Sequence, residues 1–244
     1  MKVLNAHAKL VGCPLTVLPP LENAVVGLAG GAPQQLENAS LASAMARVVF
    51  QRFPEIDAAN AIALGLQASK LPGRGQICEN EGVTYYLDGA HTLESVKCAT
   101  QWFARALPSK GKDPIVLVFH CSHDRDGLAL LKSILQAVKP DLFNLALFVP
   151  TTMGRPSAGV PPSLGYDKPS AVDPGGSGWH RSLALAWQHL APPGHNQSQA
   201  LLSPTDLVKA VPPHSHVFVV GSFYLVGDVL RDIVHWNPDG EGAF

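Results

Sequence analysis

The sequence has little charge and no excess of either sign. Charged residues make up 15% of the 244, and 18 Lys and Arg stand against 19 Asp and Glu, for a formal net charge of −1. Binding to phosphate backbones or anionic membranes needs clustered basic side chains, so this composition excludes an electrostatic binder of nucleic acid or of a membrane surface. The hydrophobic content of 46% with this near-zero net charge also excludes a largely disordered chain.

The chain also lacks a disulfide framework and a membrane span. The four cysteines show no C-x-x-C pair and no regular spacing: Cys13, Cys78, Cys98 and Cys121. This pattern is typical of reduced thiols in a cytosol-like compartment. No apolar run approaches the roughly 18–20 residues of a membrane helix, and the apolar stretch near the start is too short for a signal peptide. We therefore expect a soluble chain with nothing that directs secretion.

Glycine and proline are plentiful instead, with 22 and 21 residues, and they interrupt the first part of the chain. The run from Lys9 to Pro20 predicts one short strand between breakers, before a glycine-rich stretch at 27–33. Because a lone strand leaves its backbone groups without partners, we interpret 1–33 as the remnant of a sheet that this chain does not contain. Helical periodicity then predicts a two-helix connector at 34–74. Its helices are expected at 34–53 and 58–69.

From 75 to 244 short apolar runs alternate with helical segments. The predicted strands are 83–87, 115–119, 145–149 and 217–220, and the predicted helices are 93–107, 127–138 and 223–234. Apolar strands alternating with helices predict an α/β fold, a Rossmann-like, mostly parallel sheet with helices on both faces. The stretch at about 151–178 is rich in Pro, Gly and Ser without periodicity, which predicts a loop insertion.

Polar residues follow the ends of these strands, where ligands bind in parallel sheets. Asp88-Gly89-Ala90-His91 places a carboxylate and an imidazole on one turn. Asp88 could accept ribose hydroxyls, or it could simply cap the next helix. Ser222, after the last strand, is more typical of a helix cap.

The remaining candidates are weaker. His120 and His123 stand three apart without a third ligand nearby, so no zinc or other metal site is expected. Arg125 is either a solvated loop residue or a partner for a carboxylate. Arg74 follows a rigid Pro-Gly turn, and there it could hold a phosphate.

No complete triphosphate cradle is present. The sequence contains neither Gly-x-x-x-x-Gly-Lys-[Ser/Thr] nor a Gly-x-Gly-x-x-Gly after a strand. The second absence also removes support for a nicotinamide-dependent oxidoreductase.

Six short stretches nevertheless recur in the order found in one family. They are Gly12-Cys13-Pro14-Leu15, Gly27-Leu28-Ala29-Gly30, Asn38-Ala39-Ser40-Leu41-Ala42, Leu71-Pro72-Gly73-Arg74-Gly75-Gln76, Leu87-Asp88-Gly89-Ala90-His91-Thr92-Leu93-Glu94-Ser95 and Gly221-Ser222-Phe223-Tyr224-Leu225-Val226-Gly227. Pro-Gly-Arg together with Asp-Gly-Ala-His is the most specific combination. The chain resembles the C-terminal part of folylpolyglutamate synthases, members of the Mur ligase group.

The resemblance implies an ATP-dependent ligase that adds L-glutamate to the γ-carboxyl of tetrahydrofolate or its polyglutamates through an acyl phosphate. It places ATP between a central P-loop domain and this part. Asn38 would then face the adenine, Arg74 the phosphates and Asp88 the ribose. His91, Arg125 and Ser222 would hold the glutamate, with Arg74 and His91 as the catalytic residues.

The same resemblance implies a domain organisation. Residues 1–33 would be the end of the central ATPase domain, 34–74 a helical connector and 75–244 the C-terminal glutamate-ligase domain. The P-loop and the Mg²⁺ ligands would lie in the central domain and have no positions here, so we expect no activity from this chain alone. The family implies a location in the cytoplasm, and additionally in mitochondria.

Two other interpretations stay open. The first is a non-catalytic regulatory or scaffolding remnant of the same fold. The second is a dihydrofolate synthase or another Mur-type ligase, because most folate contacts would lie in the absent half.

Overall fold

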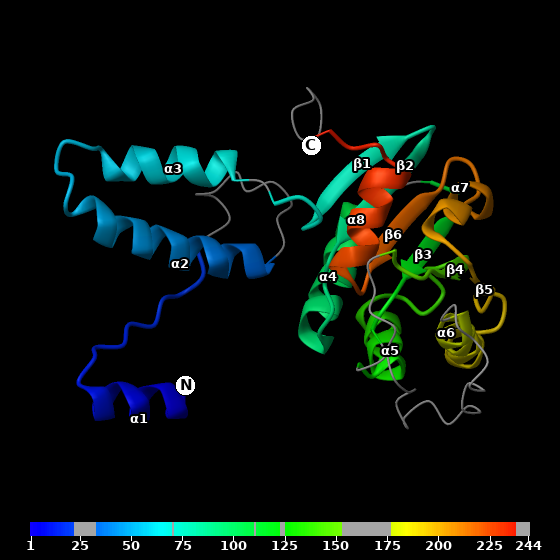
Figure 1. Cartoon of the computed structure of the whole chain (residues 1–244), viewed down its shortest axis with the longest axis horizontal. Coiled ribbons are helices and arrows are strands. Elements are labelled where there is room, and N and C mark those ends of the chain that lie inside the picture. Colours follow the sequence, from blue (N-terminus) through cyan, green and yellow to red (C-terminus); the bar gives the residue numbers. More distant parts are fainter. Residues whose placement is uncertain (22–32, 70, 110, 123–124, 153–176, 238–244) are drawn as a thin grey trace. The chain divides into compact units, whose positions relative to one another are not determined.

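The structure, a computed structural model (Figure 1), describes residues 1–21, 33–69, 71–109, 111–122, 125–152 and 177–237. It divides into two compact units, Met1–Lys70 and Leu71–Phe244. Apart from its two ends, the predicted insertion at 151–178 lies outside the described residues. The assignment of these segments to domains of a larger enzyme stays a prediction.

The first unit begins with a helix, and the strand predicted near the start is wrong. Helix α1 (Lys2–Val11) takes up the beginning of that run, and the segment from Gly12 to Leu21 contains no strand. The physical reason is that alanine, leucine and lysine favour a helix before Gly12 ends it with a φ of 66°. The prolines that follow cannot donate to a strand ladder.

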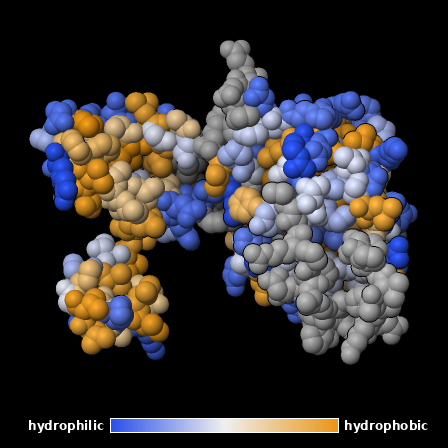
Figure 2. All heavy atoms as spheres, in the orientation of Figure 1, coloured by the Kyte–Doolittle hydropathy of each residue, from blue (hydrophilic) through white to orange (hydrophobic). Residues whose placement is uncertain are grey.

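The two helices predicted at 34–53 and 58–69 are confirmed as α2 (Pro33–Phe50) and α3 (Ala58–Ala68). Asp57 caps α3, because its Oδ1 accepts from the backbone N–H groups of Ala59 and Asn60, both at 3.2 Å. Apolar residues gather on the surface of this unit (Figure 2), and along α2 Leu41, Met45 and Val48 are more than half exposed.

The second unit is built on a six-stranded sheet of order β1-β2-β6-β3-β4-β5. The strands are β1 (Gln76–Asn80), β2 (Val83–Asp88), β3 (Ile115–Phe119), β4 (Leu145–Phe148), β5 (Ser198–Ala200) and β6 (His216–Val220). All neighbouring pairs from β2 to β5 are parallel, and only β1 runs antiparallel. The four predicted strands and the mostly parallel sheet are therefore confirmed.

The helices of this unit are α4 (Leu93–Ala106), α5 (Gly127–Ala137), α6 (Ser177–Leu190), the 3-10 turn η3 (Pro204–Asp206), α7 (Leu207–Ala210) and α8 (Phe223–Asp232). One face of the sheet is aromatic: Tyr86 and Phe218 pack on Phe103 of α4, with ring centroids 5.0 and 4.6 Å apart. The other face is mostly aliphatic, and there Val219 packs in one cluster with Val229 of α8. Helices thus cover both faces, as predicted (Figure 1).

Two strands, β1 and β5, are not predicted from the sequence. β1 pairs with β2 through the two-residue turn Glu81-Gly82, whose φ values of 49° and 77° are those of a type I′ hairpin. The Glu-Gly turn can be recognised in the sequence. Polar residues alternate along β1, however, so the segment before the turn lacks the apolar run that predicts a strand. β5 is a three-residue edge strand paired only with β4, too short to show any periodicity.

Candidate functional site

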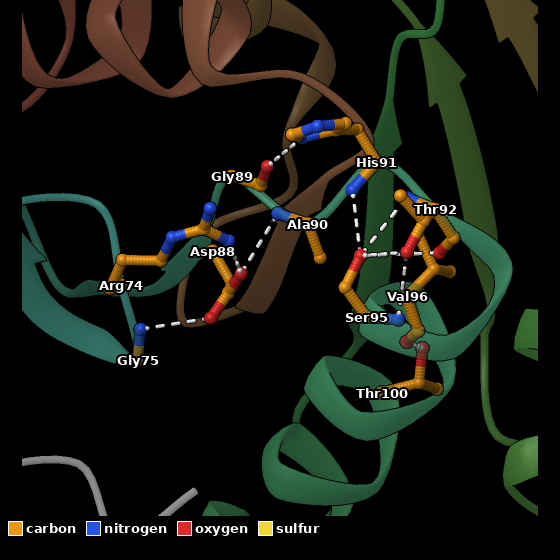
Figure 3. Close-up of polar contacts among 10 residues, drawn as sticks. All are labelled: Arg74, Gly75, Asp88, Gly89, Ala90, His91, Thr92, Ser95, Val96 and Thr100. Carbon is orange, nitrogen blue, oxygen red and sulfur yellow. Dashed lines mark hydrogen bonds and ion pairs between the residues drawn. The ribbon is translucent and has the colours of Figure 1, made fainter. Parts of the chain in front are cut away.

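Asp88 is the last residue of β2, and its carboxylate accepts hydrogen bonds from two loops (Figure 3). Its Oδ1 accepts from Arg74 Nη1 at 3.1 Å and from the Ala90 N–H at 2.8 Å, and its Oδ2 accepts from the Gly75 N–H at 3.1 Å. The carboxylate is buried, whereas the Arg74 side chain is 25% exposed. The structure therefore brings together the two residues predicted for ribose and phosphates.

Backbone contacts join the same two loops. The Gly89 N–H donates to the Gly73 carbonyl at 2.8 Å, and the Gly221 N–H donates to the Ala90 carbonyl at 2.8 Å. The chain after β2, the turn that carries Arg74 and the start of α8 are thus bonded to one another. Because β2, β6 and β3 are adjacent and parallel, their carboxyl ends share this edge of the sheet.

Burial and charge act in opposite directions on the Asp88 carboxyl. Burial raises its pKa above the ordinary value of 3.8, because a desolvated carboxylate is disfavoured. The Arg74 charge and the hydrogen bonds from Ala90 and Gly75 lower it, yet the pKa stays raised. The folded chain therefore holds this proton more tightly than the unfolded chain, and this carboxyl contributes less stability as pH rises from 3.8 through the folded pKa.

This balance predicts a pH-dependent effect of Arg74→Met. Without the guanidinium the pKa of Asp88 rises further, and near pH 7 a buried carboxylate loses its charged partner. We expect a loss of about 1–3 kcal/mol near pH 7 and a smaller loss near pH 4, where the carboxyl takes up a proton. Urea unfolding followed by tryptophan fluorescence measures this, since all four tryptophans lie in the second unit. An equal loss at both pH values would contradict the account.

His91 lies at the next turn, before α4. Its Nδ1 is 2.9 Å from the Gly89 carbonyl oxygen (Figure 3), and because a carbonyl only accepts, Nδ1 carries the proton. Arg125 Nη1 donates to the His91 carbonyl at 2.7 Å, so these two predicted glutamate ligands are neighbours. Thr92 and Ser95 form a capping box that fixes where α4 begins.

Ser222 and Asn38 differ from the central group. Ser222 Oγ accepts from the Tyr224 N–H at 3.1 Å, which is the helix-cap contact that the sequence also allowed. Asn38 lies on an exposed part of α2 in the first unit. Their predicted roles toward glutamate and adenine stay predictions, as do those of Arg74, Asp88, His91 and Arg125.

His120 follows β3 and is buried. Its Nδ1 lies 3.0 Å from the Val149 carbonyl oxygen and 3.0 Å from Nε2 of His180 in α6. His123, the other histidine of the loop, lies outside the described residues. Within the described ranges no three His, Cys, Asp or Glu side chains are close enough to hold a metal ion.

A hollow of about 1000 Å³ lies at the opposite edge of the sheet, where β3 and β6 begin. Its lining includes Arg105, Asp113, Lys139 and His216. None of the predicted site residues lines it, so the candidate site is the contact cluster at the carboxyl edge and not this hollow.

Three groups of the cluster around Asp88 have no role predicted from the sequence. The Gly75 and Ala90 N–H groups bind Asp88, and the Phe223 ring lies against Arg74. All three lie within the motifs quoted above, but no residue pattern tells which backbone N–H points at a carboxylate.

The fold and this cluster define a doubly wound α/β domain whose polar site lies where its parallel strands end. No model of a known protein family matches the chain. Sequence relatives do exist: mitochondrial folylpolyglutamate synthase of Homo sapiens is 32% identical over 193 residues, 65% of this chain and 32% of that protein. Folylpolyglutamate synthase of Saccharomyces cerevisiae strain YJM789 is 28% identical over 250 positions, 94% of this chain and 44% of that protein.

A solved structure agrees on the fold. Folylpolyglutamate synthase of Mycobacterium tuberculosis, complexed with ADP and AMPPCP, aligns with 95% of this chain and 52% of its own at a TM-score of 0.62 and 16% identity. The chain resembles folylpolyglutamate synthases and spans about a third to a half of their length. This partial coverage is consistent with a chain that corresponds to one part of these synthases. Among the described residues no helix is long and apolar enough to cross a membrane.

Proposed function

We propose that this chain is the glutamate-ligase part of an enzyme that adds L-glutamate to the γ-carboxyl of a reduced folate. The observation that carries the proposal is the Arg74–Asp88 contact at the carboxyl edge of the sheet, formed by the two motifs most specific for folylpolyglutamate synthases. The similarity to two such synthases at 32% and 28% identity supports it.

In the proposed reaction the terminal phosphate of ATP passes to the folate carboxylate, giving an acyl phosphate and ADP. The glutamate amine then attacks the acyl carbon, an amide bond forms, and phosphate leaves. The amine loses a proton in this step. Both steps concentrate negative charge on phosphate oxygens, so a fixed guanidinium beside them stabilises the transition state.

The groups of the cluster fit a nucleotide. A carboxylate has about four acceptor positions. The three bonds from Arg74, Ala90 and Gly75 leave Asp88 one position for a ribose hydroxyl. Arg74 uses one of its five side-chain N–H groups on Asp88, and no other hydrogen-bond acceptor for this side chain is found among the described residues. The remaining N–H groups suit phosphate oxygens.

His91 and Arg125 are the proposed glutamate ligands. Nδ1 of His91 is held by the Gly89 carbonyl, which leaves Nε2 for the incoming amino acid. Arg125 has one N–H on the His91 carbonyl, and its other donors match a carboxylate. Ser222 at the start of α8 is a further proposed glutamate ligand. Asn38 on α2, in the other unit, is proposed to contact the adenine.

Magnesium ligands are proposed to come from a P-loop part of the enzyme, since the described residues hold no cluster of metal-binding side chains. A separate chain or a longer product of the same gene would supply that part. We propose a cytoplasmic location, with mitochondria as a second one, because the human relative is by name mitochondrial.

The proposal predicts no catalysis by this chain alone and catalysis after assembly. Purified chain with ATP, Mg²⁺, L-glutamate and tetrahydrofolate should release no ADP. Adding a separately purified P-loop half of a folylpolyglutamate synthase should restore glutamate-dependent ADP release and folate elongation. Bovine serum albumin in place of this chain is the control. Steady ADP release from the chain alone would contradict the expected dependence on the P-loop half. A mixture of the two parts that releases no ADP would favour the non-catalytic remnant.

A further inference from the structure

Phe223, the first residue of α8, lies directly against the candidate site. The Arg74 Cζ atom is 4.0 Å from the centroid of its ring, which places the guanidinium within cation–π range. The centroid of the His91 ring lies 6.4 Å from the centroid of the same Phe223 ring. One ring thus contacts residues of both loops that form the site.

Two glycines lie close against the start of α8, and one of them, Gly89, makes room for the Phe223 ring. A Cβ atom at residue 89 would overlap the Phe223 ring, and one at residue 73 would come within 3.9 Å of it and within 2.6 Å of Val226 Cγ1. Both loops therefore approach the start of α8 more closely than any side-chain-bearing residue allows. The Gly73 and Gly89 positions serve close packing against this helix.

The ring restricts where the guanidinium can lie. The Arg74 side chain is partly exposed and long, so without a surface beneath it many rotamers would be open to it. Between the ring face and the Asp88 carboxylate, the guanidinium is limited to positions that keep Nη1 on Oδ1.

We propose that Phe223 is a positioning residue, whose ring face holds the Arg74 guanidinium beside Asp88 and thereby fixes it where the transferred phosphate arrives. The second half of this statement rests on the proposed function. Phe223 itself touches no reacting atom, so its effect passes through Arg74.

The contact is tested first in the chain alone, with the pKa of the Asp88 carboxyl followed by ¹³C NMR. Phe223→Leu keeps an apolar side chain but removes the ring face, so Arg74 leaves Asp88 more often and the pKa of Asp88 should rise. Phe223→Tyr keeps the face and should match the unchanged chain. Tyr224→Leu, at an exposed neighbour, is the control and should also match it. The same pKa in all four proteins would overturn the proposal.

A measurement without any variant covers the case in which Phe223→Leu does not fold. In the unchanged chain the Phe223 ring current should shift the Arg74 Nε proton upfield from its position in an unfolded peptide. An unshifted proton would overturn the proposal.

The consequence for catalysis is tested in the mixture with the P-loop half. Phe223→Leu should lower turnover about two- to tenfold, with little change in the ATP concentration needed for half-maximal rate. Phe223→Tyr keeps the ring face, so its turnover should equal that of the unchanged chain. Equal turnover in the Leu and Tyr variants would overturn the positioning role. If the unchanged chain were inactive in this mixture, the proposed function would be contradicted instead. A raised pKa of Asp88 in Phe223→Leu would still support the contact between Phe223 and Arg74.

Discussion

Arg74→Ala should lower the turnover of the assembled enzyme about ten- to thousandfold, the range for losing one donor that stabilises transition-state charge. The guanidinium lies beside Asp88 with most of its N–H groups without a partner among the described residues, so removing it takes positive charge from the place proposed for the phosphates. Glutamate-dependent ADP release in the mixture with the P-loop half measures the effect. Unchanged turnover would remove Arg74 from the mechanism.

Asp88→Asn is the matched comparison. It keeps a side chain of the same shape at the ribose position but removes the charge, so it should mainly raise the ATP concentration needed for half-maximal rate. The thermal midpoint of each variant, followed by tryptophan fluorescence, separates loss of function from loss of folding. If Asp88→Asn lowered maximal turnover as strongly as Arg74→Ala, the division between ribose and phosphate roles would be wrong.

Gly221→Ala should destabilise the second unit by about 2–5 kcal/mol, because it combines strained backbone with overpacking. Gly221 has a φ of 103°, and a Cβ there would overlap the His120 carbonyl oxygen and press on the Phe119 ring. The Phe119 ring and the His120 carbonyl belong to a buried strand end, so moving either of them away costs free energy. Urea unfolding followed by the four tryptophans, all in this unit, gives the free energy of unfolding.

Gly227→Ala is the control for that measurement. Gly227 lies within α8, exposed, and nothing stands within 4 Å of a Cβ built there. Alanine favours a helix over glycine by about 1 kcal/mol, so this variant should be as stable as the original or more so. A loss below about 1 kcal/mol for Gly221→Ala would show that the strand end relaxes around the added methyl group.

Helix α6 shows why one part of the fold could not be predicted. Trp179, Leu183 and Trp187 are buried along one side of it at helical spacing, so the signal exists in the sequence. The Pro- and Gly-rich residues before it masked where the helix begins. The strand predicted near the start failed because the residues up to Val11 favour a helix, and the prolines after Gly12 cannot donate to a strand ladder.

The sequence by itself determined the parallel sheet, because runs such as Ile115–Phe119 and 217–220 are apolar on both faces and must be covered on both. It also placed Asp88 and Arg74 in motifs whose resemblance to folylpolyglutamate synthases predicts that both residues face one nucleotide. Only the tertiary structure decided which groups meet at that carboxylate. The Gly75 N–H and the Phe223 ring reach Asp88 and Arg74 through chain segments far apart in sequence, and a hydrogen bond or a ring contact depends on positions in space that no local pattern fixes.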